Sequence, residues 1–171
     1  ASLQEDLERF NQTSGHAHNA SKGPSVFRLH DHTERLFKSA STVNMAIPYT
    51  VEDINKAHIE VIQVNNLQEA YIRPMCFYGS EGMGLRADNL NVHTMVAAWE
   101  WPSYFSPKKL LQGIKLNVSK WLRPSPESAP TDSKAAGLYM ICSLSKHEAE
   151  KLGFDDALML DYRGYIAEAT G

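Results

Sequence analysis

The sequence predicts an α/β or α+β fold with mixed sheets, and two observations lead to this prediction. Stretches with the two-residue alternation of strands and stretches with helical spacing follow one another along the 171 residues, without a strict strand–helix–strand rhythm. Apolar residues make up 43% and charged residues 22% of the chain, which is the composition of a globular protein with a sizeable core.

Charge and cysteine usage exclude several classes of protein. A net charge of -3 argues against a nucleic-acid binder that neutralises phosphates. No apolar run is long enough to span a bilayer, so we expect no membrane association. Cys76 and Cys142 lie in apolar contexts and do not form a disulfide framework. The expected location is therefore the reducing cytoplasm.

The first quarter of the chain predicts helix, loop, strand and helix in that order. Residues 1–10 have helical spacing of their apolar residues, and residues 11–25 have no apolar period and are predicted to be a loop. Residues 26–29 are a short strand candidate. Asp31 or Thr33 is a candidate cap for the helix that follows.

The clearest helix start is Thr50, whose hydroxyl can cap a first turn that carries acidic residues. Its apolar stripe continues until Asn65 disrupts it. Residues 70–77 predict a strand and residues 79–91 a glycine-containing loop. Residues 92–99 are nearly continuously apolar, which predicts a strand covered on both faces.

Residues 102–110 predict a linker with a short helical turn and a domain boundary. Residues 113–121 alternate as a strand, with Ile114, Leu116 and Val118 on one side. A proline-containing loop follows over residues 124–130.

A long helix is then expected to begin at Asp132 or Ser133, to run through Lys151 and to end at Gly153. The last expected elements are strands over residues 157–162 and 165–169, joined in a hairpin.

Four segments in this order and at these separations resemble the branched-chain amino-acid aminotransferases, which are pyridoxal-phosphate enzymes of fold type IV. The segments are Phe27 to Leu36, Ala70 to Pro74, Pro130 to Tyr139 and Asp161 to Gly171.

The resemblance implies a small mixed α/β domain over residues 22–101, a linker over 102–112 and the start of the larger cofactor-binding domain over 113–171. The resemblance runs from about Lys22 to the last residue, and residues 1–21 are unmatched. The family's opening strands are missing before residue 22, and the family continues past Gly171. We therefore expect a fragment.

Lys134 is the residue that the resemblance implies for catalysis. Transamination needs an amine that forms a Schiff base with the cofactor aldehyde and later moves the proton at the substrate's α carbon. Ser133, Ala135 and Ala136 are small and leave room for a ring. Without the resemblance, a solvated helix lysine would be the better interpretation.

Three more residues are implied to hold the cofactor, pyridoxal 5'-phosphate. Glu168 would keep the ring nitrogen protonated, and Tyr139 would bond the phenolic oxygen. Arg35 would bind the phosphate, because a guanidinium forks onto phosphate oxygens. The alternatives are a surface charge for Glu168, a core tyrosine for Tyr139, and a helix-turn pair with Asp31 for Arg35.

The resemblance also implies a substrate pocket. Tyr71 and Arg73 alternate on one strand, so both point to the same side, where they would accept an apolar side chain or the distal carboxylate of glutamate. Tyr104 would line the same pocket. Met83 and Leu85 would lie on a loop that crosses a homodimer interface. The alternatives are an exposed strand edge and flexible apolar surface.

The implied function is transfer of an amino group between L-leucine, L-isoleucine or L-valine and 2-oxoglutarate, in a homodimer or higher homo-oligomer. Two alternatives remain: another fold-type IV enzyme, namely a D-amino-acid aminotransferase or an aminodeoxychorismate lyase, and a truncated fragment without activity. Metal is not expected, because the pairs His16-x-His18 and His30-x-His32 have no third ligand.

Overall fold

The computed structural model describes residues 17–20, 23–101 and 105–170. The helix expected over residues 1–10 lies outside this part of the chain. The chain divides into two compact units, residues 1–103 and 104–171, and each unit is described separately. Both combine helices with strands, so the α/β class is confirmed. No helix in the described ranges is long and apolar enough to cross a membrane.

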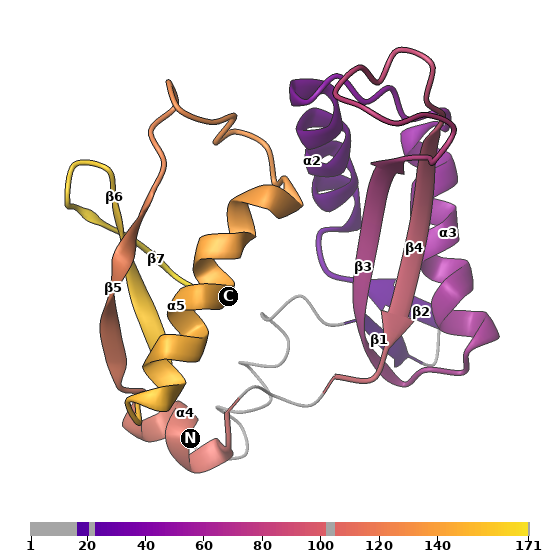
Figure 1. Cartoon of the computed structure of the whole chain (residues 1–171). Coiled ribbons are helices and arrows are strands. Elements are labelled where there is room, and N and C mark those ends of the chain that lie inside the picture. Colours follow the sequence, from indigo (N-terminus) through magenta and orange to yellow (C-terminus); the bar gives the residue numbers. More distant parts are fainter. Residues whose placement is uncertain (1–16, 21–22, 102–104, 171) are drawn as a thin grey trace. The chain divides into compact units, whose positions relative to one another are not determined.

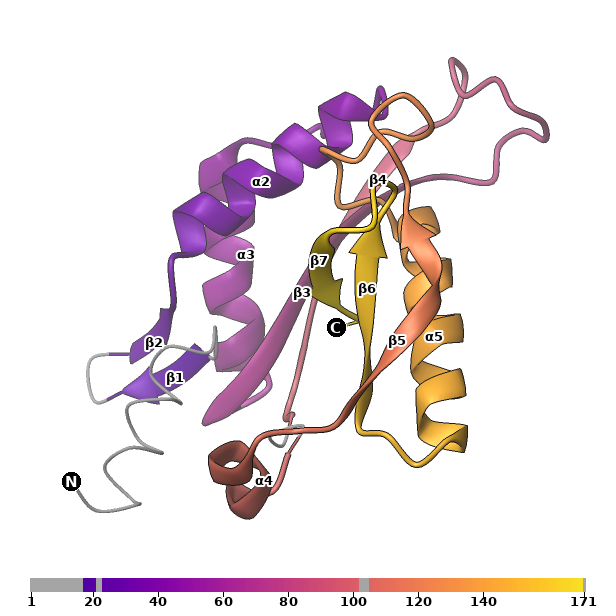
Figure 2. The same cartoon turned by 90° about the vertical axis from the view of Figure 1, so that its left-hand side faces the viewer.

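The first unit contains two helices and an antiparallel sheet with the strand order β2-β1-β3-β4 among its described residues. The elements are β1 (Ala17–Ala20), β2 (Gly23–Val26), α2 (Leu29–Thr42), α3 (Val51–Val64), β3 (Glu69–Tyr78) and β4 (Val92–Trp99). Helices α2 and α3 lie on one side of β3 and β4 (Figure 1), and the β1–β2 hairpin extends the sheet beside β3 (Figure 2).

The side chains at even positions of β3 and β4 face α3 and the segment that joins α2 to α3. Cys76 Sγ lies 3.9 Å from Met45 Sδ, and the Tyr78 hydroxyl donates to the Asn44 carbonyl at 2.8 Å. Ile54 and Ile62 of α3 are buried in the core. The odd positions of these strands therefore form the opposite face of the sheet.

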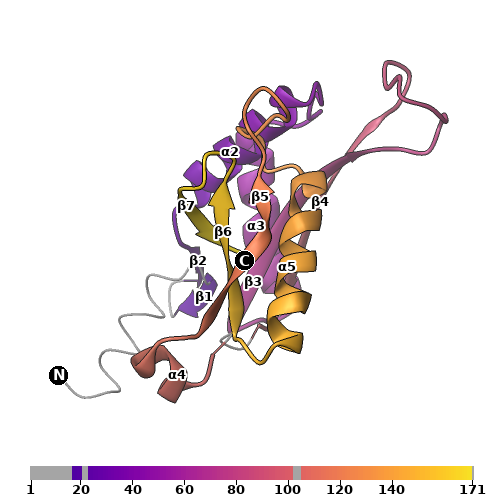
Figure 3. The same ribbon diagram turned by 60° about the vertical axis from the view of Figure 1, so that its left-hand side comes forward.

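The second unit contains a three-stranded sheet, among its described residues, with the order β5-β6-β7. Its elements are α4 (Pro107–Gln112), β5 (Leu116–Arg123), η1 (Ala136–Tyr139), α5 (Met140–Lys151), β6 (Asp156–Asp161) and β7 (Ile166–Ala169). Strands β5 and β6 are parallel, and β7 is antiparallel to β6. Helix α5 lies along β5 and β6 (Figure 3).

Two predictions near the chain start are wrong. Residues 17–20 and 23–26 form a hairpin within the segment expected to be a loop, because its main chains pair from Ala17–Val26 to Ala20–Gly23. The strand expected over residues 26–29 does not form, because Arg28 has a left-handed conformation with φ 47° and the helix begins at Leu29.

The proposed caps of α2 are also wrong. Asp31 lies inside the first turn, and Thr33 is fully buried within the helix. The Thr33 hydroxyl donates to Asn55 Oδ1 of α3 at 2.6 Å. A tertiary hydrogen bond, rather than capping, therefore accounts for this threonine.

One strand prediction has the right place but the wrong burial. Strand β4 is not covered on both faces, because Met95 is 42% exposed where the helices cover only the other side. In β5, Val118 and Ser119 lie on opposite sides, as predicted, and it is Ser119 that is buried while Val118 is exposed. Ser119 Oγ lies 2.6 Å from Ser145 Oγ of α5.

The helix expected from Asp132 begins later, because Ala135 is extended and a short 3₁₀ turn precedes α5. The stop at Gly153 is confirmed by its φ of 80°. The hairpin of β6 and β7 is confirmed, and Gly164 lies in its turn with φ 89°.

The start of α3 generates a first testable prediction. Thr50 Oγ1 accepts from the Asp53 N–H at 3.1 Å, and Asp53 Oδ2 accepts from the Thr50 N–H at 2.9 Å. We expect Thr50→Ala to lower the free energy of unfolding by about 1 kcal/mol, because the first turn loses its cap. Urea unfolding measures this. The control is Thr42→Ala near the end of α2, and equal losses in both variants would contradict the prediction.

His58 generates a prediction about acid stability. Its side chain is buried at 2% exposure, and Nδ1 donates to the Ile54 carbonyl at 2.7 Å. Burial lowers the pKa of His58 below its ordinary value. The unfolded chain, with an ordinary imidazole, binds more protons as the pH falls below about 6.5.

We therefore expect the free energy of unfolding to decrease from about pH 7 to about pH 5. In His58→Gln this part of the pH dependence is lost, whereas the exposed control His30→Gln keeps it. Unfolding in urea at a series of pH values measures the slope. An unchanged slope in His58→Gln contradicts the assignment.

Candidate functional site

Lys134 lies in the segment that leads into η1. Ser133 is buried, and its backbone N–H donates to the Pro130 carbonyl at 3.0 Å, which anchors the chain before the lysine. Ala135 is extended, with ψ 134°. The Lys134 side chain is exposed, and its Nζ lies 5.9 Å from the centroid of the Tyr139 ring. A fixed backbone thus presents an accessible amine beside an aromatic ring.

Tyr139 is the last residue of η1, and its ring is near two cations. Besides the Lys134 amine, the Arg123 guanidinium carbon lies 5.9 Å from the ring centroid. The 3₁₀ turn brings Tyr139 back towards the residues that precede it. The structure therefore places Lys134 and Tyr139 close together.

Glu168 of β7 joins this group through Arg123. The two side chains form an ion pair, with Nε 3.0 Å from Oε1, in which the arginine is 17% and the glutamate 50% exposed. Arg123 Nη1 also donates to the Leu138 carbonyl in η1 at 2.9 Å. Lys134, Tyr139, Glu168 and Arg123 form one connected cluster, which we call the β5–β7 cluster.

Arg123 is a residue that sequence reasoning missed. It is the last residue of β5 and comes directly before a proline-containing loop. Nothing in its local spacing distinguishes it from a surface arginine. Its contacts with η1 and β7 arise only when segments 15 and 45 residues away pack beside it.

Cys142 lies against the same arginine but does not provide a nucleophile. Arg123 Nη1 lies 3.4 Å from Cys142 Sγ. Burial raises the pKa of the Cys142 thiol, and the positive charge of Arg123 opposes this only in part. The thiol is therefore protonated at neutral pH and packs as a small apolar group.

A second cluster lies in the first unit, on the odd-numbered face of β3 and β4. The guanidinium carbon of Arg73 lies 5.3 Å from the centroid of the Tyr71 ring and 5.6 Å from that of Trp99. Trp101 lies 5.4 Å from Tyr71, centroid to centroid. Arg73 is paired with the small Ala97, which leaves space over the strand for these rings. We call this group the Arg73 cluster.

The Arg73 cluster contains both residues expected in the substrate pocket, and two that were not predicted. Trp99 and Trp101 end β4 and begin the next segment. A tryptophan–glutamate–tryptophan sequence places two indoles two positions apart, which is the signal that could have identified them. Tyr104, also predicted for this pocket, lies outside the described residues.

Met83 and Leu85 lie on the loop between β3 and β4, which projects beyond the strand ends (Figure 3). Both side chains are fully exposed, at 102% and 106%. The base of the loop is fixed by Glu81, whose carboxylate accepts from the Asn91 amide at 2.8 Å. This hydrogen bond lowers the pKa of Glu81. Two apolar side chains are thus presented from an anchored loop.

Arg35 is an exposed residue of α2, with its guanidinium 3.5 Å from His32 Nδ1. Asp31 does not pair with Arg35, because it accepts from Arg28 at 2.5 Å. His30 Nε2 lies 3.4 Å from Glu34 Oε1. Among the described residues, no group of three or more His, Cys, Asp or Glu side chains has the arrangement of a metal site.

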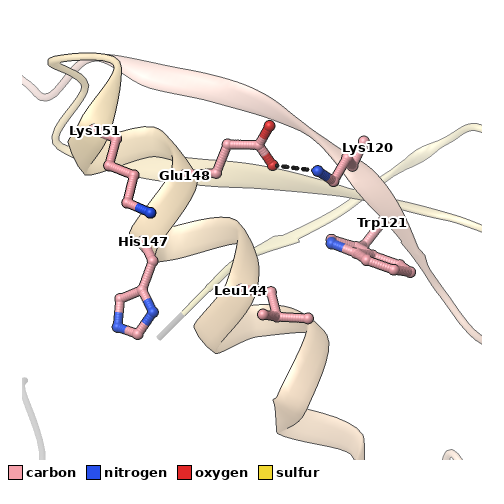
Figure 4. Close-up of a pocket in the computed structure, with 6 residues that line it drawn as sticks. All are labelled: Lys120, Trp121, Leu144, His147, Glu148 and Lys151. Atoms are coloured by element: carbon pink, nitrogen blue, oxygen red, sulfur yellow. Dashed lines mark ion pairs between the residues drawn. The ribbon is translucent and has the colours of Figure 1, made fainter.

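A surface groove of the second unit lies elsewhere, between β5 and α5 (Figure 4). It is crossed by the Lys120–Glu148 ion pair, 3.1 Å between Nζ and Oε2. None of the residues predicted for the site lines this groove. The residues of the β5–β7 cluster therefore do not line this groove.

The amino-transferase class IV family matches residues 20–171 of this chain. A branched-chain-amino-acid aminotransferase of Pseudomonas aeruginosa is 47% identical over 155 residues, which cover 91% of this chain and 50% of that protein. The Escherichia coli K12 enzyme of the same name is 38% identical over 151 residues, or 88% of this chain and 49% of that protein. The chain spans about half the length of these curated relatives.

Solved structures of branched-chain amino acid aminotransferases also match this chain. A branched-chain amino acid aminotransferase of Escherichia coli matches with a TM-score of 0.85 and 36% identity, over 91% of this chain and 52% of that one. A T.th. branched-chain amino acid aminotransferase with pyridoxamine 5'-phosphate matches with a TM-score of 0.85 and 37% identity, over 91% and 52%. The same enzyme complexed with N-(5'-phosphopyridoxyl)-L-glutamate matches with a TM-score of 0.80 and 36% identity, over 91% and 50%.

Proposed function

We propose that this chain, which belongs to the amino-transferase class IV family, is part of a branched-chain amino-acid aminotransferase. The reaction is transfer of the amino group between L-leucine, L-isoleucine or L-valine and 2-oxoglutarate, with Lys134 as the residue that forms a Schiff base with pyridoxal 5'-phosphate. The observation that supports this most directly is the β5–β7 cluster, which joins an amine, a phenol and a carboxylate.

The chemistry of this cluster fits the cofactor. When bound, pyridoxal phosphate supplies an aldehyde that condenses with amines and a ring that withdraws electrons from the substrate's α carbon. Lys134 offers the primary amine, on an exposed side chain among small neighbours. Tyr139 offers a hydroxyl for the phenolic oxygen. Glu168 is half exposed, so a ring nitrogen can reach its carboxylate.

The chain's own residues then have separate tasks. Lys134 takes the proton from the substrate's α carbon and returns it to the product, because a neutral amine within reach can act as base and then as acid. Glu168 holds a proton at the ring nitrogen, and its ion pair with Arg123 orients the carboxylate. Arg35 is proposed to bind the phosphate through its guanidinium.

The Arg73 cluster is the proposed basis of substrate choice. Its three aromatic rings provide an apolar surface for a branched side chain. Arg73, held over two of these rings, provides the positive charge that glutamate's distal carboxylate needs. Tyr104 is proposed to line the same pocket. Met83 and Leu85 are proposed to close the pocket of a second copy, in a homodimer or higher homo-oligomer of the cytoplasm.

The role of Lys134 is tested by covalent trapping. Tritiated borohydride, added to the protein that carries this sequence together with pyridoxal phosphate, should place label on the Lys134 peptide. Lys134→Ala should lose the label and at least roughly 10³-fold of turnover, as other covalent enzymes do without their reacting side chain. Lys151→Ala, another exposed lysine of the same unit, should keep both. Label on a different residue, or no label, would refute the proposal.

The substrate pocket is tested by Arg73→Met. Loss of a charged hydrogen-bond donor should lower kcat/KM for glutamate by roughly 10- to 100-fold, because such bonds contribute about 1.5–3 kcal/mol. The value for leucine should change much less. The control Arg28→Met removes a guanidinium from the same unit.

Equal losses for leucine and glutamate would show that Arg73 does not select the carboxylate. Turnover of D-alanine without turnover of L-leucine would instead favour a D-amino-acid aminotransferase.

A further inference from the structure

We propose that Arg123 is a positioning residue of the β5–β7 cluster, which orients Glu168 and Tyr139 and fixes a positive charge beside them. This role rests on the proposed function. Arg123 does not itself contact cofactor or substrate in this proposal. It acts through Glu168 and Tyr139, which are proposed to touch the cofactor.

The geometry shows how one guanidinium reaches three elements. From the end of β5, its Nε lies 3.0 Å from Glu168 Oε1 on β7, and its Nη1 donates to the Leu138 carbonyl in η1 at 2.9 Å. Its carbon lies 5.9 Å from the Tyr139 ring centroid. The planar fork of an arginine can make these contacts simultaneously, whereas the single ammonium of a lysine cannot reproduce them.

Burial separates Arg123 from the other arginines in described ion pairs. The Arg123 side chain is 17% exposed, whereas those of Arg28, Arg86 and Arg163 are 66%, 90% and 58% exposed. Exposed pairs contribute little, because water and side-chain entropy oppose them. A largely buried arginine with a backbone acceptor and a carboxylate has a restricted conformation, so it can hold its partners in place.

The fixed charge also has an electrostatic consequence. Lys134 and Arg123 each lie 5.9 Å from the centroid of the same ring. A cation held beside this ring disfavours a further positive charge on a cofactor bound there. Removing the positive charge of Arg123 should therefore make the bound cofactor easier to protonate.

The test compares Arg123→Gln, Arg123→Lys and the control Arg163→Gln in the protein that carries this sequence. Arg163 also pairs with a carboxylate in this unit, 2.7 Å from Asp161, but lies in the β6–β7 turn. For each protein we would measure the melting temperature, the dissociation constant of pyridoxal phosphate, kcat and KM for leucine, and the absorption spectrum of the bound cofactor against pH.

In Arg123→Gln the midpoint of the spectral titration should rise by about one pH unit, because a neighbouring positive charge is lost. The dissociation constant should rise roughly 10-fold and kcat should fall by a similar factor, with a smaller change in KM. Arg123→Lys should restore the midpoint, since it keeps the charge, but not the affinity, since it loses the fork. Arg163→Gln should match the unsubstituted protein.

An unmoved midpoint in a folded Arg123→Gln overturns the positioning role. If that variant does not fold, Arg123→Lys decides, and undiminished cofactor affinity in it overturns the role. Failure of the proposed function is a different result: in that case the unsubstituted protein takes no borohydride label at Lys134. Label at Lys134 with an unmoved midpoint rejects the Arg123 inference alone.

Discussion

The ion pair between Arg123 and Glu168 connects the residues of the second unit that we propose to be functional. It joins the end of β5 to β7, and the hydrogen bond from the same guanidinium to Leu138 adds η1. Lys134 and Tyr139 lie at the two ends of the short segment that this bond anchors. One guanidinium therefore contacts three elements that are distant in sequence.

Sequence reasoning succeeded where the determining interactions are local. The capping box at Thr50 and Asp53 is made by residues three positions apart, so it was predictable, as was the left-handed stop at Gly153. It failed where a distant partner decides. Thr33 is one of two candidate caps in the sequence, yet its hydroxyl donates to Asn55 of the neighbouring helix, 22 residues away.

The strand faces show the same limit. On β3, simple alternation placed Tyr71 and Arg73 together, and the structure has them within hydrogen-bond distance, 3.4 Å between Nη2 and the hydroxyl. On β5, Ser119 rather than Val118 is buried because α5 packs against the side of Ser119, and a register shift against β6 follows. Arg123, which follows this shift, could not be assigned an inward direction from the sequence.

The two clusters support different parts of the proposal. Any enzyme that uses pyridoxal phosphate in this fold needs an amine, a partner for the phenolic oxygen and a carboxylate for the ring nitrogen, so Lys134, Tyr139 and Glu168 argue for the cofactor rather than for a substrate. The proposed basis of substrate choice is instead Arg73 and the aromatic rings around it. Because the clusters belong to separately packed units, substitutions in one can change specificity while the covalent chemistry of the other is retained. Replacements within the Arg73 cluster are then the expected route to a change of substrate.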